Sequence, residues 1–193
     1  MKICILSGSP RKNSNTKKLA LAIQNQLLKK NFSVNTIDFS EYDIPLMVSG
    51  KVDLANLTAF QYSLYTSMSD ANLIFVLSPE YNWMPSAELI NFFHQMGDKP
   101  YASMWKDKTF AVAGVSNGRG GKLPCIQISY VLNKICGFMG FESFVCPRTF
   151  ESQFTQNVLD GEGKSLGNIE FDNGLEVYIN FAVSMAKKTN ITK

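Results

Sequence analysis

The segment SGSPRKNSNTKK, residues 7–18, combines hydroxyl, amide and basic side chains and contains no acidic residue. It follows an apolar run and leads into a stretch in which Leu19, Ile23 and Leu27 recur at helical spacing. The start of a helix offers unpaired backbone N–H groups and the positive end of the helix dipole, so this segment suits a dianionic phosphate. The side chains that would complete such a site are those of Ser9, Arg11, Ser14, Asn15 and Thr16.

The spacing of this loop argues against two common nucleotide-binding classes. It matches neither G-x-x-x-x-G-K-[ST] nor G-x-G-x-x-G, which disfavours an NTPase and a dinucleotide-binding Rossmann loop. A simpler interpretation is that Ser14 or Asn15 caps a solvated basic helix. That interpretation explains these two residues but not the concentration of hydroxyls and cations around them.

Two further polar loops follow apolar runs. SPEYNWMP, residues 78–85, carries Tyr81 and Trp83, whose flat faces suit a planar heterocycle, although they could instead close the top of the core. SNGRGGKLP, residues 116–124, has three glycines that let backbone N–H groups approach a ligand, although such turns are common without one. Ligands of open parallel sheets bind beyond the carboxyl ends of the strands, so all three loops are candidates for one site.

Short apolar runs alternate with segments of helical spacing along the chain. We expect strands at residues 3–6, 34–37, 73–77, 110–115 and 141–146, mostly continuous in apolar character, as in strands covered on both faces. Between them, apolar residues recur at i, i+3, i+4 and i+7, for example at Leu89, Phe92, Phe93 and Met96. This alternation predicts an α/β fold in which a doubly wound parallel sheet is the middle layer of three.

The composition indicates one ordinary globular domain over residues 1–193. Because no apolar run approaches the roughly 20 residues of a membrane span, and the N-terminus lacks a signal peptide, we expect a cytoplasmic protein that does not bind membranes. A net charge of +3 with scattered basic residues argues against nucleic acid as a partner.

Neither the cysteines nor the acidic residues form a pattern for binding metal. Cys4, Cys125, Cys136 and Cys146 lie far apart in the sequence and are expected to be free, mostly buried thiols. Residues 148–173 are rich in acids and glycines but lack the spacing of a calcium loop, so we interpret them as a turn-rich surface loop.

In order and spacing, the segments GSPRKNSNTKK, DIPL, PEYNWMPSAELIN and GVSNGRGGKLP resemble the NADPH-dependent FMN reductase family of flavodoxin-like quinone, azo and chromate reductases. The likeness extends over residues 3–150, and PEYN is its most specific element. The resemblance implies a flavodoxin-like, five-stranded parallel sheet of order 2-1-3-4-5 with FMN across the strand ends. In this comparison Ser9, Arg11, Ser14, Asn15 and Thr16 hold the FMN phosphate, Pro79, Glu80, Tyr81 and Asn82 line the ring and ribityl chain, and Ser116, Asn117, Gly118 and Gly121 flank the isoalloxazine.

The chain departs from the family pattern after PEYN. Trp83 and Met84 stand where a small residue is usual, so we expect a narrower face beside the flavin ring. His94, the only histidine, stands where an Asp is usual and is expected to be a packed or interface residue without a catalytic role.

The expected function is that of an FMN-dependent NAD(P)H oxidoreductase, with NADPH or NADH as donor and a quinone, azo compound, metal ion or free flavin as acceptor. The sequence has no nucleophile–base motif, so no protein group is assigned as a catalytic acid or base. One flavin-type site without a second dinucleotide fingerprint predicts that donor and acceptor use the same face in turn, which gives ping-pong kinetics. The alternatives are a flavodoxin-type electron carrier and a flavin-free module that binds a phosphate ester or a partner protein.

A homodimer or homotetramer is also expected. The predicted helices after PEYN and after the glycine-rich loop carry more apolar residues than are needed to cover one face of a sheet. The resemblance to the FMN reductase family also implies dimers in which these helices pair. The residues concerned are Phe92, Phe93, Met96, Ile128, Val131 and Ile135.

Overall fold

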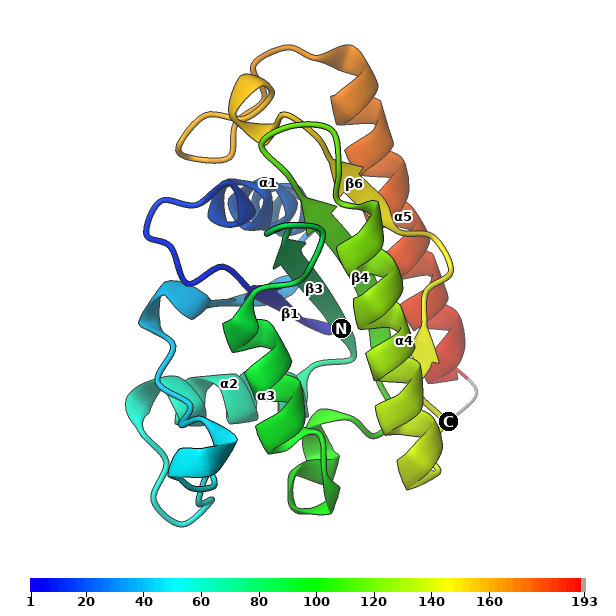
Figure 1. Ribbon diagram of the computed structural model, residues 1–193. Helices are drawn as coiled ribbons and strands as arrows, with labels where there is room; N and C mark the ends of the chain where they lie inside the picture. The colour runs from blue at the N-terminus through cyan, green and yellow to red at the C-terminus, as the bar shows by residue number, and fades with distance from the viewer. Residues whose placement is uncertain (192–193) are drawn as a thin grey trace.

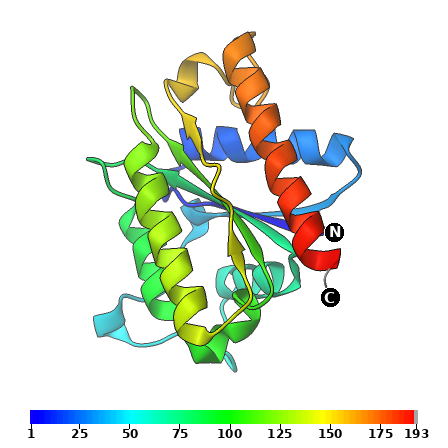
Figure 2. The same ribbon diagram turned by 90° about the vertical axis from the view of Figure 1, so that its right-hand side faces the viewer.

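The computed structural model describes residues 1–191 and shows a six-stranded parallel sheet between two layers of helices (Figures 1 and 2). The main path of the sheet has the order β2-β1-β3-β4-β5, which confirms the predicted flavodoxin-like topology. The strands are β1 (Lys2–Ser7), β2 (Ser33–Asp38), β3 (Leu73–Pro79), β4 (Thr109–Val115), β5 (Phe144–Val145) and β6 (Phe150–Ser152).

Burial explains the sequence pattern of the strands. Every residue of β3 and of β4 is buried, because helices cover both faces of these central strands, and both read as unbroken apolar runs. The edge strand β2 pairs only with β1 in the sheet and alternates exposed with partly buried positions over most of its length. The difference between continuous and alternating patterns therefore follows from position in the sheet.

The helices divide between the two faces of the sheet, as the view in Figure 2 shows. α1 (Asn15–Lys29) and α5 (Ile169–Ile191) pack on one face, and α2 (Ala59–Asp70), α3 (Ala87–Met96) and α4 (Lys122–Met139) pack on the other. Leu19, Ile23 and Leu27 are fully buried, as their spacing predicts. Short 3-10 helices lie at Phe39–Glu41, Met47–Ser49, Lys99–Met104 and Thr155–Asn157. Within residues 1–191, no helix combines the length and the apolar character needed to cross a membrane.

The five predicted strands form the main path of the sheet, and a sixth strand lies beside it because the last edge of the sheet is split. The expected strand at 141–146 is reduced to β5, and Pro147, which cannot donate to a ladder, follows shortly after it. The chain then pairs with β4 a second time as β6, with Phe150 opposite Ala113 and Ser152 opposite Val115. Part of the segment 148–173, expected to be a surface loop, is therefore a strand of the sheet.

The apolar stripes used to predict an oligomer are buried within one copy of the chain. Phe92, Met96 and Ile128 have no exposed surface, and Phe93 and Ile135 are 4% and 3% exposed. They fill the core between the sheet and the helices α2, α3 and α4. The sixth residue, Val131, is partly buried against the same core. These residues therefore do not supply the surplus apolar surface from which the oligomer was predicted, and the oligomer stays a prediction.

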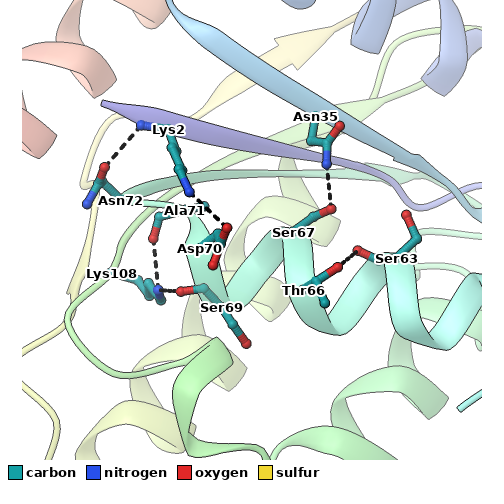
Figure 3. Close-up of polar contacts among 10 residues, drawn as sticks. All are labelled: Lys2, Asn35, Ser63, Thr66, Ser67, Ser69, Asp70, Ala71, Asn72 and Lys108. Carbon is teal, nitrogen blue, oxygen red and sulfur yellow. Dashed lines mark hydrogen bonds and ion pairs between the residues drawn. The ribbon is translucent and has the colours of Figure 1, made fainter.

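A buried lysine ties α2 to the strands at the end of the sheet opposite to the loops described below (Figure 3). Lys108 is 7% exposed, and its Nζ donates to the carbonyl oxygens of Ser69 at 2.5 Å and of Ala71 at 2.8 Å. These carbonyls lie at the C-terminus of α2, where the helix leaves its last acceptors unpaired and the dipole favours a cation. Lys108 therefore caps α2 from a position just before β4.

Candidate functional site

The loops that follow β1, β3 and β4 surround a cleft of about 560 Å³. β1 lies between β2 and β3, so the chain order reverses beside it, and such a switch point is where open α/β sheets bind ligands. In Figure 1 the arrows of β3 and β4 point toward the same end of the molecule, where these loops lie. The residues that line the cleft are Ser9, Arg11, Lys12, Asn13, Ser14, Asn15, Thr16, Pro79, Glu80, Tyr81, Asn82, Val115, Ser116 and Asn117.

The first wall of the cleft is the N-terminus of α1. Ser14 is the N-cap, and its Oγ accepts a hydrogen bond from the N–H of Lys17 at 3.1 Å. The first turn of α1 contains no acidic residue, so nothing there neutralises the positive end of the dipole. Arg11 and Lys12 add two exposed cations. This wall is suited to an anion with several oxygens.

The first and second loops are joined through Tyr81. The hydroxyl of Tyr81 lies 2.9 Å from Oγ of the fully buried Ser9. Ser9 Oγ also accepts from the N–H of Arg11 at 3.3 Å. The guanidinium of Arg11 lies over the Tyr81 ring, 4.5 Å from its centroid. Arg11 therefore has a cation–π partner in the free protein, and an anion in the cleft must compete with the ring for its charge.

The second loop ends in a tight turn with two residues in left-handed conformations. Tyr81 and Met84 exchange backbone hydrogen bonds at 2.9 and 3.0 Å, and between them Asn82 and Trp83 have φ of 50° and 68°. Positive φ at both central residues defines a type I′ turn, in which Gly is the usual second residue. Trp83 is 70% exposed, and neither Trp83 nor Met84 lines the cleft, so the expected narrowing by these two side chains is not seen.

Glu80 connects the second loop to the third. Its carboxylate accepts the N–H of Gly121, which is the N-cap of α4 and has φ of 97°. A Cβ on Gly120 would meet this carboxylate, and a Cβ on Gly114 would collide with the backbone of Gly121. The glycines of the third loop thus allow a close approach to Glu80 and β4. Among the described residues that line the cleft, Glu80 is the one acidic side chain, and one of its two oxygens accepts this hydrogen bond.

A fourth segment, which sequence reasoning did not single out, reaches the rim of the cleft. Nδ2 of Asn15 donates to Oδ1 of Asn117 at 2.6 Å and to Oε1 of Gln156 at 3.0 Å. Nε2 of Gln156 donates to the backbone carbonyl of Asn117 at 2.9 Å. Gln156 thereby bridges the first and third loops.

Eleven of the thirteen predicted site residues line the same cleft, and two do not. Gly118 donates its N–H to Ser116 Oγ and accepts from Phe154, and Gly121 begins α4, so both shape the third loop without lining the cleft. Lys12, Asn13 and Val115 line the cleft but were not predicted, although each is adjacent in sequence to a residue that was. His94 is exposed in the last turn of α3 and does not line the cleft, so it is not packed in the core.

The cysteines are not available for nucleophilic chemistry. All four are free and buried. Burial raises the pKa of Cys4, Cys125 and Cys146 from 9.0 to about 12, and that of Cys136 to about 11. Thiols with such pKa values are protonated at neutral pH. Among the described residues, no group of three His, Cys, Asp or Glu side chains is arranged to hold a metal ion.

The parallel sheet of order 2-1-3-4-5, with a cleft at its switch point, defines a flavodoxin-like fold. Residues 1–146 match the family model of NADPH-dependent FMN reductases. The match covers more than half of the chain, and the chain belongs to this family. It is therefore a flavin reductase with FMN as cofactor and NAD(P)H as electron donor.

Solved structures with the same fold include proteins of this kind. The flavoenzyme NAD(P)H:(acceptor) oxidoreductase FerB from Paracoccus denitrificans has a TM-score of 0.74 and 18% identity, covering 97% of this chain and 98% of that one. The NADH:FMN oxidoreductase EmoB, in its apo form, has a TM-score of 0.63 and 19% identity, covering 95% and 89%. A flavodoxin from the domain Archaea has a TM-score of 0.60 and 18% identity, covering 98% and 99%. A search of curated proteins gave no match.

The residues present in the cleft fit FMN. A dianionic phosphate fits the N-terminus of α1, where Ser14, Asn15 and Thr16 begin the helix and two cations stand beside it. The volume of about 560 Å³ falls within the range of small-molecule sites, and Tyr81 with Pro79 provides apolar surface for a planar ring.

Proposed function

We propose that this chain, acting as a single FMN-binding domain, transfers electrons from NAD(P)H to a small-molecule acceptor such as a quinone, an azo compound, a metal ion or a free flavin. The observation that carries the proposal is that one cleft joins the α1 N-terminus and its cations to the PEYN loop at the switch point of the sheet. Free, buried cysteines agree with a cytoplasmic location, which we also propose.

Each wall of the cleft has a distinct role in this proposal. Ser9, Arg11, Ser14, Asn15 and Thr16 bind the phosphate, and Pro79, Tyr81 and Asn82 with Ser116 and Asn117 bind the ribityl chain and ring. Glu80 lines the same part of the cleft as Pro79, Tyr81 and Asn82, and its carboxylate also accepts the N–H of Gly121, which ties this loop to the third one. Gly118 and Gly121 support the third loop from outside the cleft. FMN supplies the hydride and electron chemistry when it is bound, and the protein supplies binding, orientation and electrostatics.

Donor and acceptor occupy the same open side of the cleft in turn. The three loops enclose one cleft, so the donor leaves before the acceptor enters, and a ping-pong mechanism follows. Steady-state rates with NADPH or NADH against several acceptors test this, and parallel double-reciprocal lines are expected. Intersecting lines would refute the shared site. Failure of FMN-loaded protein to oxidise either nicotinamide would favour an electron carrier, and failure to retain FMN would favour a flavin-free binding module.

The proposal includes a homodimer or homotetramer, now on a different surface. The outer face of α4 exposes apolar side chains at helical spacing, namely Leu123 at 41%, Ile126 at 54% and Tyr130 at 75%. Exposed apolar stripes of this kind mark contact surfaces, and homo-oligomers usually close about a two-fold axis. Light scattering at micromolar concentration is expected to give at least twice the mass of one chain. A monomer would refute this part of the proposal.

A further inference from the structure

Residues 150–157, which comprise β6 and the 3-10 helix Thr155–Asn157, support the third loop from its outer side. They lie beyond the residues 1–146 that match the family model. The N–H of Ser116 donates to the carbonyl of Ser152 at 2.9 Å, and the N–H of Phe154 donates to the carbonyl of Gly118 at 3.1 Å. Hydrogen bonds to this later segment therefore hold the third loop at both Ser116 and Gly118.

A buried hydroxyl pair fixes the segment in place. Oγ of Ser152 lies 2.7 Å from Oγ1 of Thr155, and both residues are fully buried. Thr155 Oγ1 is also 3.3 Å from the carbonyl oxygen of Ser116. Phe154, between them, has φ of 46°, a conformation that costs free energy in a non-glycine residue and persists only where surrounding contacts enforce it. The backbone that carries Gln156 is thus well determined.

From this position Gln156 contacts two residues that line the cleft, although Gln156 itself does not line it. Its Oε1 accepts from Asn15 at 3.0 Å, and its Nε2 donates to the carbonyl of Asn117 at 2.9 Å. Asn15 and Asn117 are in turn joined at 2.6 Å through their own side-chain amides. The three residues form a closed triangle of hydrogen bonds across the first and third loops.

We propose that Gln156 is a positioning residue for FMN, acting through Asn15 and Asn117. The proposal rests on the proposed function, because it requires that these two residues bind the cofactor. An amide side chain at a rim samples several rotamers, and ordering it on binding costs affinity. The triangle orders both side chains before FMN arrives. Gln156 also fixes the spacing between the α1 N-terminus, which binds the phosphate, and the third loop, which borders the ring.

The test is the dissociation constant of FMN, measured from quenching of its fluorescence by the apoprotein. Gln156→Met keeps the length of the side chain and removes both hydrogen bonds, so FMN is expected to bind on the order of tenfold more weakly. Gln153→Met is the matched control, because Gln153 lies in the same segment and outside the cleft lining. The affinity of this variant for FMN should stay within about twofold of wild type. Gln156→Ala is the second variant and carries the same expectation.

A double-mutant cycle separates positioning from general loosening of the fold. The carbonyl of Asn117 that Gln156 contacts belongs to the backbone, so the cycle uses Asn15, whose side chain contacts that of Gln156. If Gln156 acts through Asn15, then Asn15→Ala combined with Gln156→Met weakens FMN binding by clearly less than the product of the two single effects. Independent, multiplicative effects would overturn the proposal, as would FMN affinity within about twofold of wild type in both Gln156 variants. Wild-type protein that does not bind FMN would overturn the proposed function and this inference with it, which is a distinguishable result.

Discussion

Arg11 gives the most direct test of the phosphate site. In the free protein its guanidinium lies 4.5 Å from the centroid of the Tyr81 ring. A charge-assisted hydrogen bond to the FMN phosphate contributes about 1.5–3 kcal/mol. Leaving the ring costs about 0.5–1 kcal/mol, because the contact is exposed. The midpoints of these two ranges differ by about 1.5 kcal/mol, so Arg11→Ala is expected to weaken FMN binding roughly tenfold.

Riboflavin provides the internal control, because it lacks the phosphate. Its dissociation constant, measured with the same fluorescence titration, should change by less than about threefold in Arg11→Ala. Arg119→Ala controls for the loss of a positive charge, because Arg119 is exposed on the third loop and does not line the cleft. Equal weakening of FMN and riboflavin by Arg11→Ala would show that Arg11 acts through the Tyr81 ring, and the assignment of the phosphate site would be refuted.

Three predictions concern stability, measured by urea unfolding. Lys108→Met leaves two carbonyls at the end of α2 without their charged donor and should lower the free energy of unfolding by about 2 kcal/mol. The control Lys106→Met, at an exposed position, should lower it by under about 0.5 kcal/mol. Equal losses in the two variants would contradict the capping role of Lys108. Trp83→Gly should stabilise the protein by about 1 kcal/mol, because it relieves a φ of 68°, and a destabilised variant would show that Trp83 makes compensating contacts. The folded-state pKa of Cys4 is raised from 9.0 to about 12, so the stability it contributes is full below pH 9 and is lost as pH rises from 9 to 12. Cys4→Ala should flatten this alkaline decline by up to about 1.4 kcal/mol per pH unit, and an unchanged slope would refute the attribution.

The sequence carried enough information for the sheet because its strands are buried on both faces. Continuous apolar runs mark β1, β3 and β4 within one or two residues of their bounds. β6 was not predicted because it has three residues, of which only Ser152 is buried. So short a strand shows neither a continuous apolar run nor a clear alternation of apolar and polar residues. Its pairing with β4 depends on the break in the edge near Pro147, which is a tertiary effect.

The candidate site was predictable wherever a loop directly follows a strand. The residues after β1, β3 and β4 converge because parallel strands bring their carboxyl ends to one edge. Gly121 begins α4 and does not line the cleft, a difference that the sequence could not reveal, because a glycine at the start of a helix and one that lets a ligand approach look alike. Gln156 was missed because its contacts with Asn15 and Asn117 are long-range and leave no local pattern.

The hydrogen bond between Asn15 and Gln156 spans 141 positions of the sequence, which bears on how the protein is made. At a synthesis rate of about 5–20 residues per second, Gln156 is added roughly 7–28 s after Asn15. During that interval the α1 N-terminus and the PEYN loop can already exist on a nascent chain, but the triangle that joins them to the third loop cannot. Ordering of the cleft rim is therefore a late event in biogenesis. A chain truncated before residue 150 would retain most of the family motifs but would lack the segment that orders this rim.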